Sequence, residues 1–208
     1  MNYEFVDIGT SYFATSIDKF GLNSIGILVE PIKKYLDIIP NSKTIIKANY
    51  AISDSNRKGS MSVPICENKN LKYLTEEEIL KISNTYDISL GGSSILNGTE
   101  VIINVPSEII ECDIITFYEL CKIYEIKKIN QLKIDTEGHD HIILQQVYKM
   151  VKNKKLDIDT IIFELSLISN EEELIKVTDK FLKELNYSIS GEPNFWGQSD
   201  IILSKIKI

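Results

Sequence analysis

Phe5-Val6-Asp7-Ile8-Gly9-Thr10-Ser11 is the stretch that decides the fold of this 208-residue chain. An apolar run ends in an aspartate, and a glycine follows that lets the backbone turn sharply and approach a ligand closely. A strand followed by such a turn and then a helix is the ligand-binding unit of an open α/β sheet. The dinucleotide fingerprint G-x-G-x-x-G would need two further glycines, where this chain has Ser11 and Ala14. The stretch therefore indicates a ligand loop without specifying the ligand.

The rest of the chain repeats this order of strand and helix. Short runs rich in β-branched residues alternate with amphipathic stretches of helical length, which is typical of a parallel sheet covered by helices. The predicted strands are 3–8, 24–29, 44–48, 132–135, 160–164 and 200–204, and the predicted helices include 11–20 and 31–39. Capping-box patterns at Thr116-Phe117-Tyr118-Glu119 and Ser169-Asn170-Glu171-Glu172 predict two further helix starts. The sequence thus predicts a single α/β domain over residues 1–208.

Residues 56–101 interrupt the alternation with Gly, Ser, Asn, Lys and Glu. They include a pattern for a capped helix at Thr75-Glu76-Glu77-Glu78 and the glycine-rich run Gly91-Gly92-Ser93-Ser94. Long irregular segments in compact domains are often covers of a binding site, so we interpret this stretch as an insertion or lid. A surface excursion without a role in binding is the alternative.

Composition and charge narrow the range of partners. Hydrophobic residues make up 43% of the chain and the net charge is −7, so we expect a globular protein without the basic surface that nucleic-acid binding needs. The N-terminus lacks a secretory pattern and no stretch stays apolar for about 18 residues, so we expect a cytoplasmic protein that does not bind membranes. Cys66, Cys112 and Cys121 are widely spaced and suggest no metal site.

Glu30 ends the second predicted strand, 21 positions after Gly9. In that place a carboxylate can accept hydrogen bonds from both hydroxyls of a ribose. The alternative is that Glu30 merely precedes Pro31 in the first turn of a helix, where the helix dipole favours a negative charge. The position relative to Gly9 favours the ribose interpretation.

A second group of polar residues follows another predicted strand, in the block Lys133-Ile134-Asp135-Thr136-Glu137-Gly138-His139-Asp140. In open α/β sheets such strand ends face the ligand crevice. Unpaired charges buried at the centre of a sheet would cost several kcal/mol, so packing alone does not explain four charged groups and a histidine here. We therefore interpret the block as part of a functional site.

Together these segments resemble the FkbM-type methyltransferases. The residues that carry the resemblance are, in order, Val6-Asp7-Ile8-Gly9, Val29-Glu30-Pro31, Ala51-Ile52-Ser53-Asp54, Leu132 to Asp140 with Ile143-Leu144, and Ile162-Phe163-Glu164. The resemblance covers nearly the whole chain. It implies a class I methyltransferase (Rossmann-like) fold, with a mostly parallel seven-stranded sheet, an antiparallel C-terminal strand and helices on both faces. It also implies S-adenosylmethionine as methyl donor and a sugar or polyketide-like hydroxyl as the usual acceptor.

The same resemblance assigns the cofactor contacts to residues near the strand ends. Loop amides would meet the methionine portion, Asp7 would lie near its amino group, Glu30 would hold the ribose, and residues after the third strand would border the adenine. The full set is Asp7, Gly9, Thr10, Ser11, Glu30, Pro31, Asn49, Tyr50, Ala51 and Asp135. The loop departs from the family pattern at Ser11 and Phe13, where an asparagine and a second glycine are usual.

Methyl transfer to a hydroxyl also needs a group that takes the hydroxyl proton. His139 and His141 are the two histidines of the chain, and His139 lies closer to the predicted strand end. Asp135 is a second candidate base, and Glu137 is a carboxylate that could orient an imidazole. An ordinary structural role for either histidine is the alternative.

Three alternatives stay open beside O-methylation of a glycan or another small-molecule hydroxyl. We assign no metal ligands, but Asp135, Glu137 and Glu164 offer the oxygen atoms that Mg²⁺ prefers. The chain could also be a non-catalytic binding or assembly module that retains the fold. A nicotinamide-dependent oxidoreductase would need the glycines that the first loop lacks. The oligomeric state is not predicted.

Overall fold

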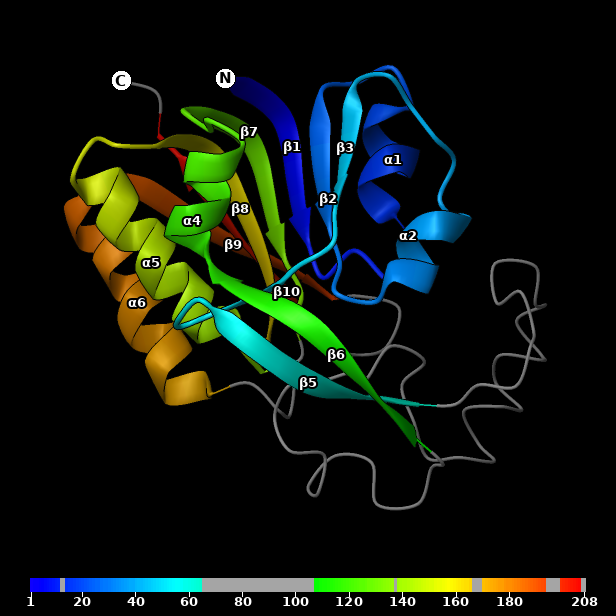
Figure 1. Cartoon of the computed structure of the whole chain (residues 1–208). Helices are drawn as coiled ribbons and strands as arrows, with labels where there is room; N and C mark the ends of the chain where they lie inside the picture. The colour runs from blue at the N-terminus through cyan, green and yellow to red at the C-terminus, as the bar shows by residue number, and fades with distance from the viewer. Residues whose placement is uncertain (12–13, 65–106, 137, 166–169, 194–198, 207–208) are drawn as a thin grey trace.

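The computed structural model describes residues 1–11, 14–64, 107–136, 138–165, 170–193 and 199–206 (Figure 1). A seven-stranded sheet forms the centre, in the order β3-β2-β1-β7-β8-β10-β9. Its strands are β1 (Asn2–Ile8), β2 (Gly26–Val29), β3 (Ile45–Ala48), β7 (Lys128–Ile134), β8 (Asp157–Leu165), β9 (Tyr187–Pro193) and β10 (Ser199–Lys205). Neighbouring strands from β3 to β8 are parallel, whereas β10 is antiparallel to both of its neighbours. The predicted α/β sheet with an antiparallel C-terminal strand is confirmed.

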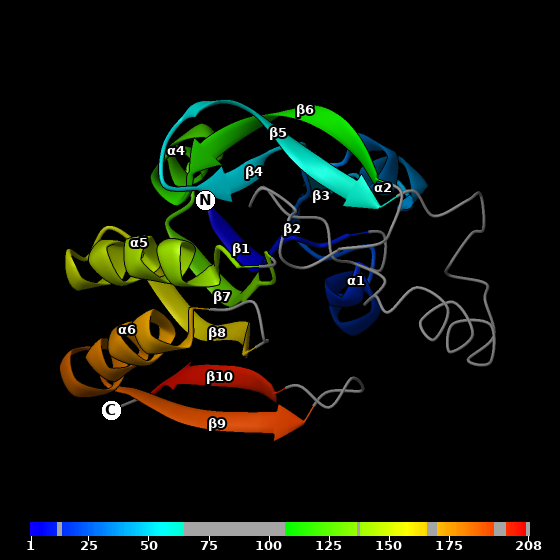
Figure 2. The same cartoon turned by 90° about the horizontal axis from the view of Figure 1, so that it is seen from below.

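Helices cover both faces of this sheet, as predicted (Figures 1 and 2). One face carries α1 (Thr15–Phe20) and α2 (Lys33–Ile38). The other face carries α4 (Phe117–Ile123), α5 (Asp140–Lys152) and α6 (Glu171–Glu184). Apolar side chains of these helices pack against the sheet, among them Phe20 of α1, Leu36 of α2 and Leu144 of α5, and full burial of one such side chain contributes about 1.5–3 kcal/mol.

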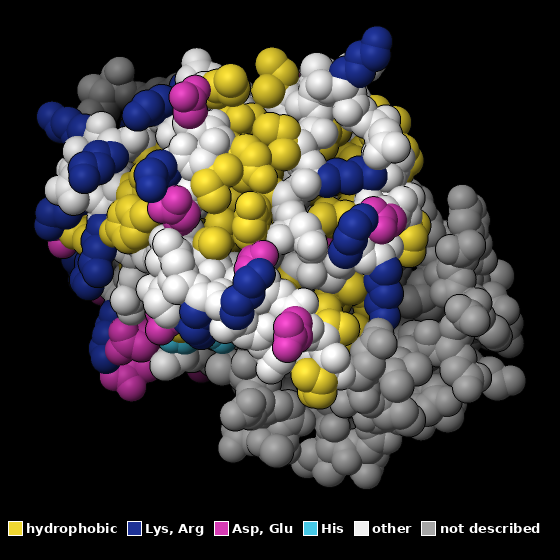
Figure 3. All heavy atoms as spheres, viewed as in Figure 1, with side chains coloured by type: hydrophobic (Ala, Val, Ile, Leu, Met, Phe, Trp, Pro, Cys, Tyr) yellow, Lys and Arg dark blue, Asp and Glu magenta, His cyan; other side chains and the backbone are white. Residues whose placement is uncertain are grey.

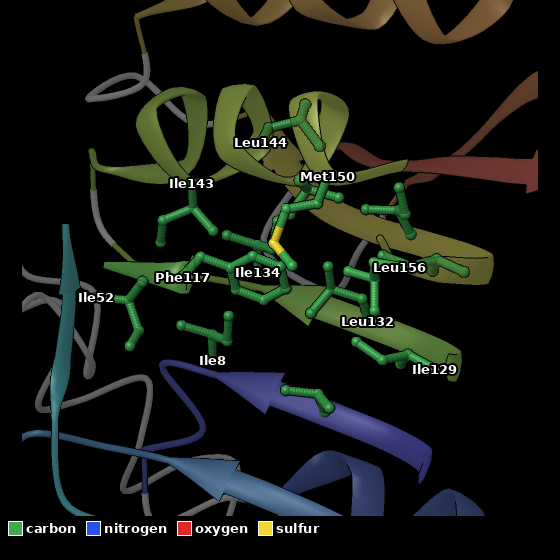
Figure 4. Close-up of a cluster of buried hydrophobic side chains, with 14 of the residues drawn as sticks. Ile8, Ile52, Phe117, Ile129, Leu132, Ile134, Ile143, Leu144, Met150 and Leu156 are labelled. Atoms are coloured by element: carbon green, nitrogen blue, oxygen red, sulfur yellow. The ribbon is translucent and has the colours of Figure 1, made fainter. Parts of the chain in front are cut away.

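The alternation of side chains along β1 divides the core into two layers. Ile8 packs with Leu132 and Ile134 of β7 under α4 and α5 (Figure 4). Phe5 faces the opposite layer, where its ring stacks on Phe20 of α1 with 5.3 Å between the ring centroids. Because successive residues of a strand point to opposite faces, Asp7 lies on the same side of the sheet as Phe5. Lys133 of β7, the register partner of Asp7, lies on this side as well.

A second, three-stranded sheet lies beside the first and was not predicted. It consists of β4 (Ala51–Ser53), β6 (Ser107–Thr116) and β5 (Arg57–Pro64), in the order β4-β6-β5. Strand β5 comes from the start of the predicted insertion at 56–101. The remainder of that insertion, with its predicted helix at 75–78, lies outside the described residues, and the interpretation as a lid stays a prediction.

The predicted strands all form, and several are longer than predicted, but three helix starts differ. Helix α2 begins at Lys33 and not at the predicted Pro31. Helix α1 begins at Thr15 rather than at residue 11, because Ser11 and Ala14 take left-handed backbone angles with φ of 52° and 46°. Helix α6 is capped by Asn170, whose side chain accepts a hydrogen bond from the Glu173 amide, and not by the predicted Ser169. The predicted cap of α4 by Thr116 is confirmed.

The surface seen in Figure 3 carries Lys and Arg side chains scattered among Asp and Glu side chains, around a central group of hydrophobic ones. Within the described ranges, no helix is both long and apolar enough to span a membrane.

Candidate functional site

The carboxyl ends of β1, β2 and β7 bring together three regions that the sequence placed far apart. Gly9 follows β1, Glu30 follows β2, and Asp135 follows β7. Gly9 has a φ of +78°, and a Cβ atom added to it would lie 1.7 Å from the carbonyl oxygen of Asp135. The Asp135 amide in turn donates to the carbonyl of Ile8 at 2.9 Å. The glycine therefore allows the loop to pack directly on the backbone after β7, a different close approach from the ligand contact that the sequence suggested.

Glu30 links the loop after β1 to the segment before α2. Its Oε2 accepts a hydrogen bond from the Ser11 amide at 2.9 Å, and its Oε1 accepts one from the Ile32 amide at 2.9 Å. The side chain is buried, and this burial, assisted by the charges of Asp7 and Asp135, raises the pKa of Glu30 to about 7. One oxygen thus serves the helix start and the other the ligand loop, so both interpretations of Glu30 describe part of its environment.

Asp7 and Lys133 lie side by side on neighbouring strands of the same sheet. Asp7 is 0% exposed, and neither of its carboxylate oxygens has a hydrogen-bond partner among the described residues. Lys133 donates from Nζ to Oδ2 of Asp135 at 3.0 Å. Burial lowers the pKa of Lys133, but the charges of Asp7 and Asp135 outweigh it and the net shift is upward. The lysine therefore stays charged between two carboxylates.

Further polar atoms near this pair are also buried without a partner in the described part of the chain. They are the side-chain hydroxyls of Thr10, Ser11 and Thr136. Buried polar atoms in proteins are nearly always hydrogen-bonded, and leaving one unsatisfied costs about 1–3 kcal/mol. Their concentration after β1 and β7 indicates a place built to receive a polar ligand.

The residues predicted to border the adenine have different surroundings. Asn49 donates from Nδ2 to the carbonyl oxygens of Glu30 and Pro31, at 2.8 Å each, and so ties the end of β3 to the end of β2. Tyr50 packs on the main core, and Ala51 is buried at the start of β4. The structure brings these residues to the edge that carries Glu30, and their contact with adenine stays a prediction.

Asp140 organises the loop between β7 and α5, a role that was not predicted from the sequence. Its Oδ1 accepts from the Thr136 amide at 3.2 Å and its Oδ2 accepts from the Gly138 amide at 3.4 Å. Burial, with a smaller contribution from Asp135, raises the pKa of Asp140 to about 6. An aspartate in the first turn of a helix was the available signal. Glu137, predicted as a catalytic residue, lies outside the described residues.

His139 immediately precedes α5 and is 7% exposed. Its Nδ1 lies 3.0 Å from Oγ of Ser53 on β4, whereas its Nε2 is buried and has no hydrogen-bond partner in the described ranges. Burial lowers the pKa of His139, so the ring is neutral near pH 7. The Ser53 carbonyl accepts from Nε2 of Gln146 on α5, which fixes β4 against that helix. Ser53 belongs to the segment 51–54 that resembles the family, and no role was predicted for it.

A family model described as the methyltransferase FkbM domain matches residues 7–189. The chain belongs to the FkbM methyltransferase family. The matched residues contain the ends of β1, β2 and β7 and the whole of α5, so the buried polar site lies within the methyltransferase domain. No curated protein matches the chain.

The structure brings several of the predicted site residues of this methyltransferase together. The structure places Asp7, Gly9, Thr10, Ser11, Glu30 and Asp135 at one edge of the sheet, and His139 on the neighbouring loop. Among the described residues, no group of three or more His, Cys, Asp and Glu side chains is arranged to hold a metal ion. Glu164 lies in β8 opposite Asp200 of β10.

Proposed function

We propose that the chain is an S-adenosylmethionine-dependent methyltransferase that methylates a hydroxyl group of a sugar or another small molecule. The observation that carries the proposal is the carboxylate of Asp7, which is fully buried beside the loop 9–11 and lacks a hydrogen-bond partner among the described residues. A buried carboxylate in that position suits a ligand that brings a positive charge and hydrogen-bond donors. S-adenosylmethionine has an ammonium group, a sulfonium and two ribose hydroxyls.

The residues at the strand ends fit the parts of this ligand. The carboxylates of Asp7 and Asp135 would face its positive charges, and the hydroxyls of Thr10 and Thr136 would supply further polar contacts. Each oxygen of Glu30 holds one amide and has lone-pair capacity for another donor, so the ribose hydroxyls could add to the existing bonds. Asp7, Thr10 and Glu30 are buried, whereas the side chain of Asp135 is 34% exposed.

When bound, S-adenosylmethionine would supply a methyl group attached to a positively charged sulfur, which departs as a neutral thioether. The protein would hold the acceptor hydroxyl in line with that methyl group and exclude water, which can lower the barrier by about 7–11 kcal/mol. It would also provide a base for the hydroxyl proton. Two points support a glycan or another polyol as acceptor. One is the family resemblance, and the other is the net charge of −7, which does not favour a nucleic acid.

Calorimetry with S-adenosylmethionine and S-adenosylhomocysteine tests the cofactor. We expect saturable binding at pH 8, where Glu30 is ionised, and an affinity about tenfold weaker for Glu30→Gln, because hydrogen bonds to a charged acceptor contribute about 1.5–3 kcal/mol. Glu4→Gln is the matched control, since Glu4 also accepts a backbone amide, from Ile25 at 2.7 Å, but before the middle of β1. Wild-type protein that shows neither heat nor a thermal shift with both compounds would contradict the proposal.

A further inference from the structure

Asp54 follows β4 and is held in its ionised form by its neighbours. Its Oδ1 accepts hydrogen bonds from Nη1 of Arg57 at 2.5 Å and from Oγ of Ser55 at 3.1 Å. The bond from Arg57 is the main reason why the pKa of Asp54 falls to about 2. An ionised carboxylate has no proton to donate and acts only as an acceptor. Every hydrogen bond to Asp54 must therefore take its proton from the partner.

Ser53 stands between this carboxylate and the histidine. Its Oγ lies 3.1 Å from Oδ1 of Asp54 and 3.0 Å from Nδ1 of His139, and the side chain is completely buried. A serine hydroxyl has one proton and two lone pairs. Since Asp54 can only accept, the hydroxyl proton points to Asp54, and the oxygen accepts from Nδ1–H of His139. The two contacts together determine which ring nitrogen of His139 carries the proton.

A neutral imidazole with its proton on Nδ1 has an unshared electron pair on Nε2. Nε2 of His139 is buried and meets no hydrogen-bond partner among the described residues. Most buried side-chain polar atoms in proteins are hydrogen-bonded, so this nitrogen is an exception, as is Nδ1 of His141. The titratable and charged groups that influence this ring are His141 on α5 and Asp54 and Arg57 beyond β4. The arrangement leaves one basic nitrogen ready to accept a proton.

We propose that Ser53, Asp54 and Arg57 are positioning residues that hold His139 in the Nδ1–H form, and that its Nε2 takes the proton of the acceptor hydroxyl during methyl transfer. This inference rests on the proposed function. The hydroxyl proton moves to Nε2 as the oxygen forms its bond to the methyl carbon, and the electron pair of the broken carbon–sulfur bond stays on sulfur. The imidazolium then returns the proton to water. Asp135, the competing base, already accepts a hydrogen bond from Lys133.

Nuclear magnetic resonance can read the ring directly, because the chain has only two histidines. Long-range ¹H–¹⁵N correlation spectra of the full chain at pH 8 separate a protonated from an unprotonated ring nitrogen, and His139→Gln assigns the signals. We expect His139 to have a protonated Nδ1 and an unprotonated Nε2. Asp54→Ala and Ser53→Ala should both change this dominant form, because the first frees the serine proton for Nδ1 and the second removes the acceptor.

Ser55→Ala is the matched control, since Ser55 donates to the same oxygen of Asp54, whereas the hydrogen bond to His139 comes from Ser53. It should leave the spectrum unchanged. The side chain of Asp54 is 62% exposed, so we expect Asp54→Ala to fold. This variant therefore tests the hydrogen bonds from Asp54 through Ser53 to His139 even if Ser53→Ala fails to fold. A wild-type His139 protonated on Nε2, or one unaffected by Asp54→Ala, would overturn the inference.

The spectra need no cofactor, so their outcome is independent of the proposed function. If wild-type protein fails to bind S-adenosylmethionine, the proposed function fails while the ring assignment stands. If His139→Gln binds S-adenosylmethionine and still methylates a methyl hexoside as fast as the wild type does, the role of Nε2 is overturned while the proposed function survives.

Discussion

The two polar regions of this methyltransferase differ in how their hydrogen bonds are completed. At the carboxyl end of β1, Asp7 is fully buried and neither oxygen has a partner in the described structure. At the end of β4, Ser53 and Asp54 are connected to His139 and Arg57 by successive hydrogen bonds. An unsatisfied buried group indicates a contact that a ligand completes, whereas a connected chain indicates a side chain fixed in advance. The difference suggests that the first region binds and the second one orients a reacting group.

The largest expected effect is on the free energy of unfolding, when the close packing of Gly9 on the backbone of Asp135 is lost. Gly9→Ala would place a Cβ atom 1.7 Å from the Asp135 carbonyl oxygen, at a φ of +78°. We expect the free energy of unfolding to fall by about 4 kcal/mol or more, measured by urea denaturation. Gly21→Ala is the control, because Gly21 has a similar φ of +84° but nothing within 4 Å of the added Cβ. It should cost roughly 1–3 kcal/mol, because a residue with a side chain is strained at a φ of 84° and a ψ of 160°. Equal losses would show that packing on β7 does not matter.

The next effect separates binding from chemistry. His139→Gln should lower kcat by about 100-fold on any methyl hexoside that the wild type methylates, since removing a general base typically costs 10²–10⁴-fold. The dissociation constant for S-adenosylmethionine, measured by calorimetry, should be unchanged, because the histidine belongs to the second region. His141→Gln, two positions further along α5, is the control and should retain kcat. A parallel loss of cofactor affinity in His139→Gln would erase the distinction between the two regions.

The smallest effect concerns Glu30 and the pH. Burial and then the charges of Asp7 and Asp135 raise the pKa of Glu30 to about 7, above its value of 4.5 in an unfolded chain. The folded protein therefore binds more protons between these values, and its stability should fall as the pH rises from about 4.5 through 7. In Glu30→Gln, the loss of folding free energy between pH 5 and pH 8 should be about 2 kcal/mol smaller than in the wild type, measured by thermal unfolding at both pH values.

The stability of Glu30→Gln should still fall somewhat as the pH rises. The pKa of Asp140 is also raised, to about 6, and this shift lowers the stability in the same direction. Glu4→Gln is the control, because Glu4 is an exposed glutamate of β1. Its stability should depend on pH as strongly as that of the wild type. A wild-type stability that rises over this pH range would contradict the raised pKa of Glu30.

Local sequence patterns predicted most of the fold. The apolar runs located the strands of the main sheet, and the cap at Thr116 located the start of α4, because periodicity and capping depend on residues only a few positions apart. The starts of α1, α2 and α6 differ from the predicted positions, since the backbone at Ala14 and Ile32 and the cap at Asn170 follow from local angles that several sequences could adopt. The small sheet was missed, because β5 and β6 pair residues such as Gly59 and Cys112 across a long separation in the chain.

The sequence by itself determined the family, the α/β sheet, and the nearness of Gly9 and Glu30, because parallel strands align their carboxyl ends at one edge. Only the tertiary structure decided which polar groups are satisfied. Ser53 and His139 lie 86 positions apart, and their contact depends on how β4 packs against α5. Asp7 and Lys133 become neighbours through the order and register of β1 and β7. Burial and hydrogen bonding are properties of the packed chain, and no local pattern encodes which nitrogen of His139 keeps its electron pair.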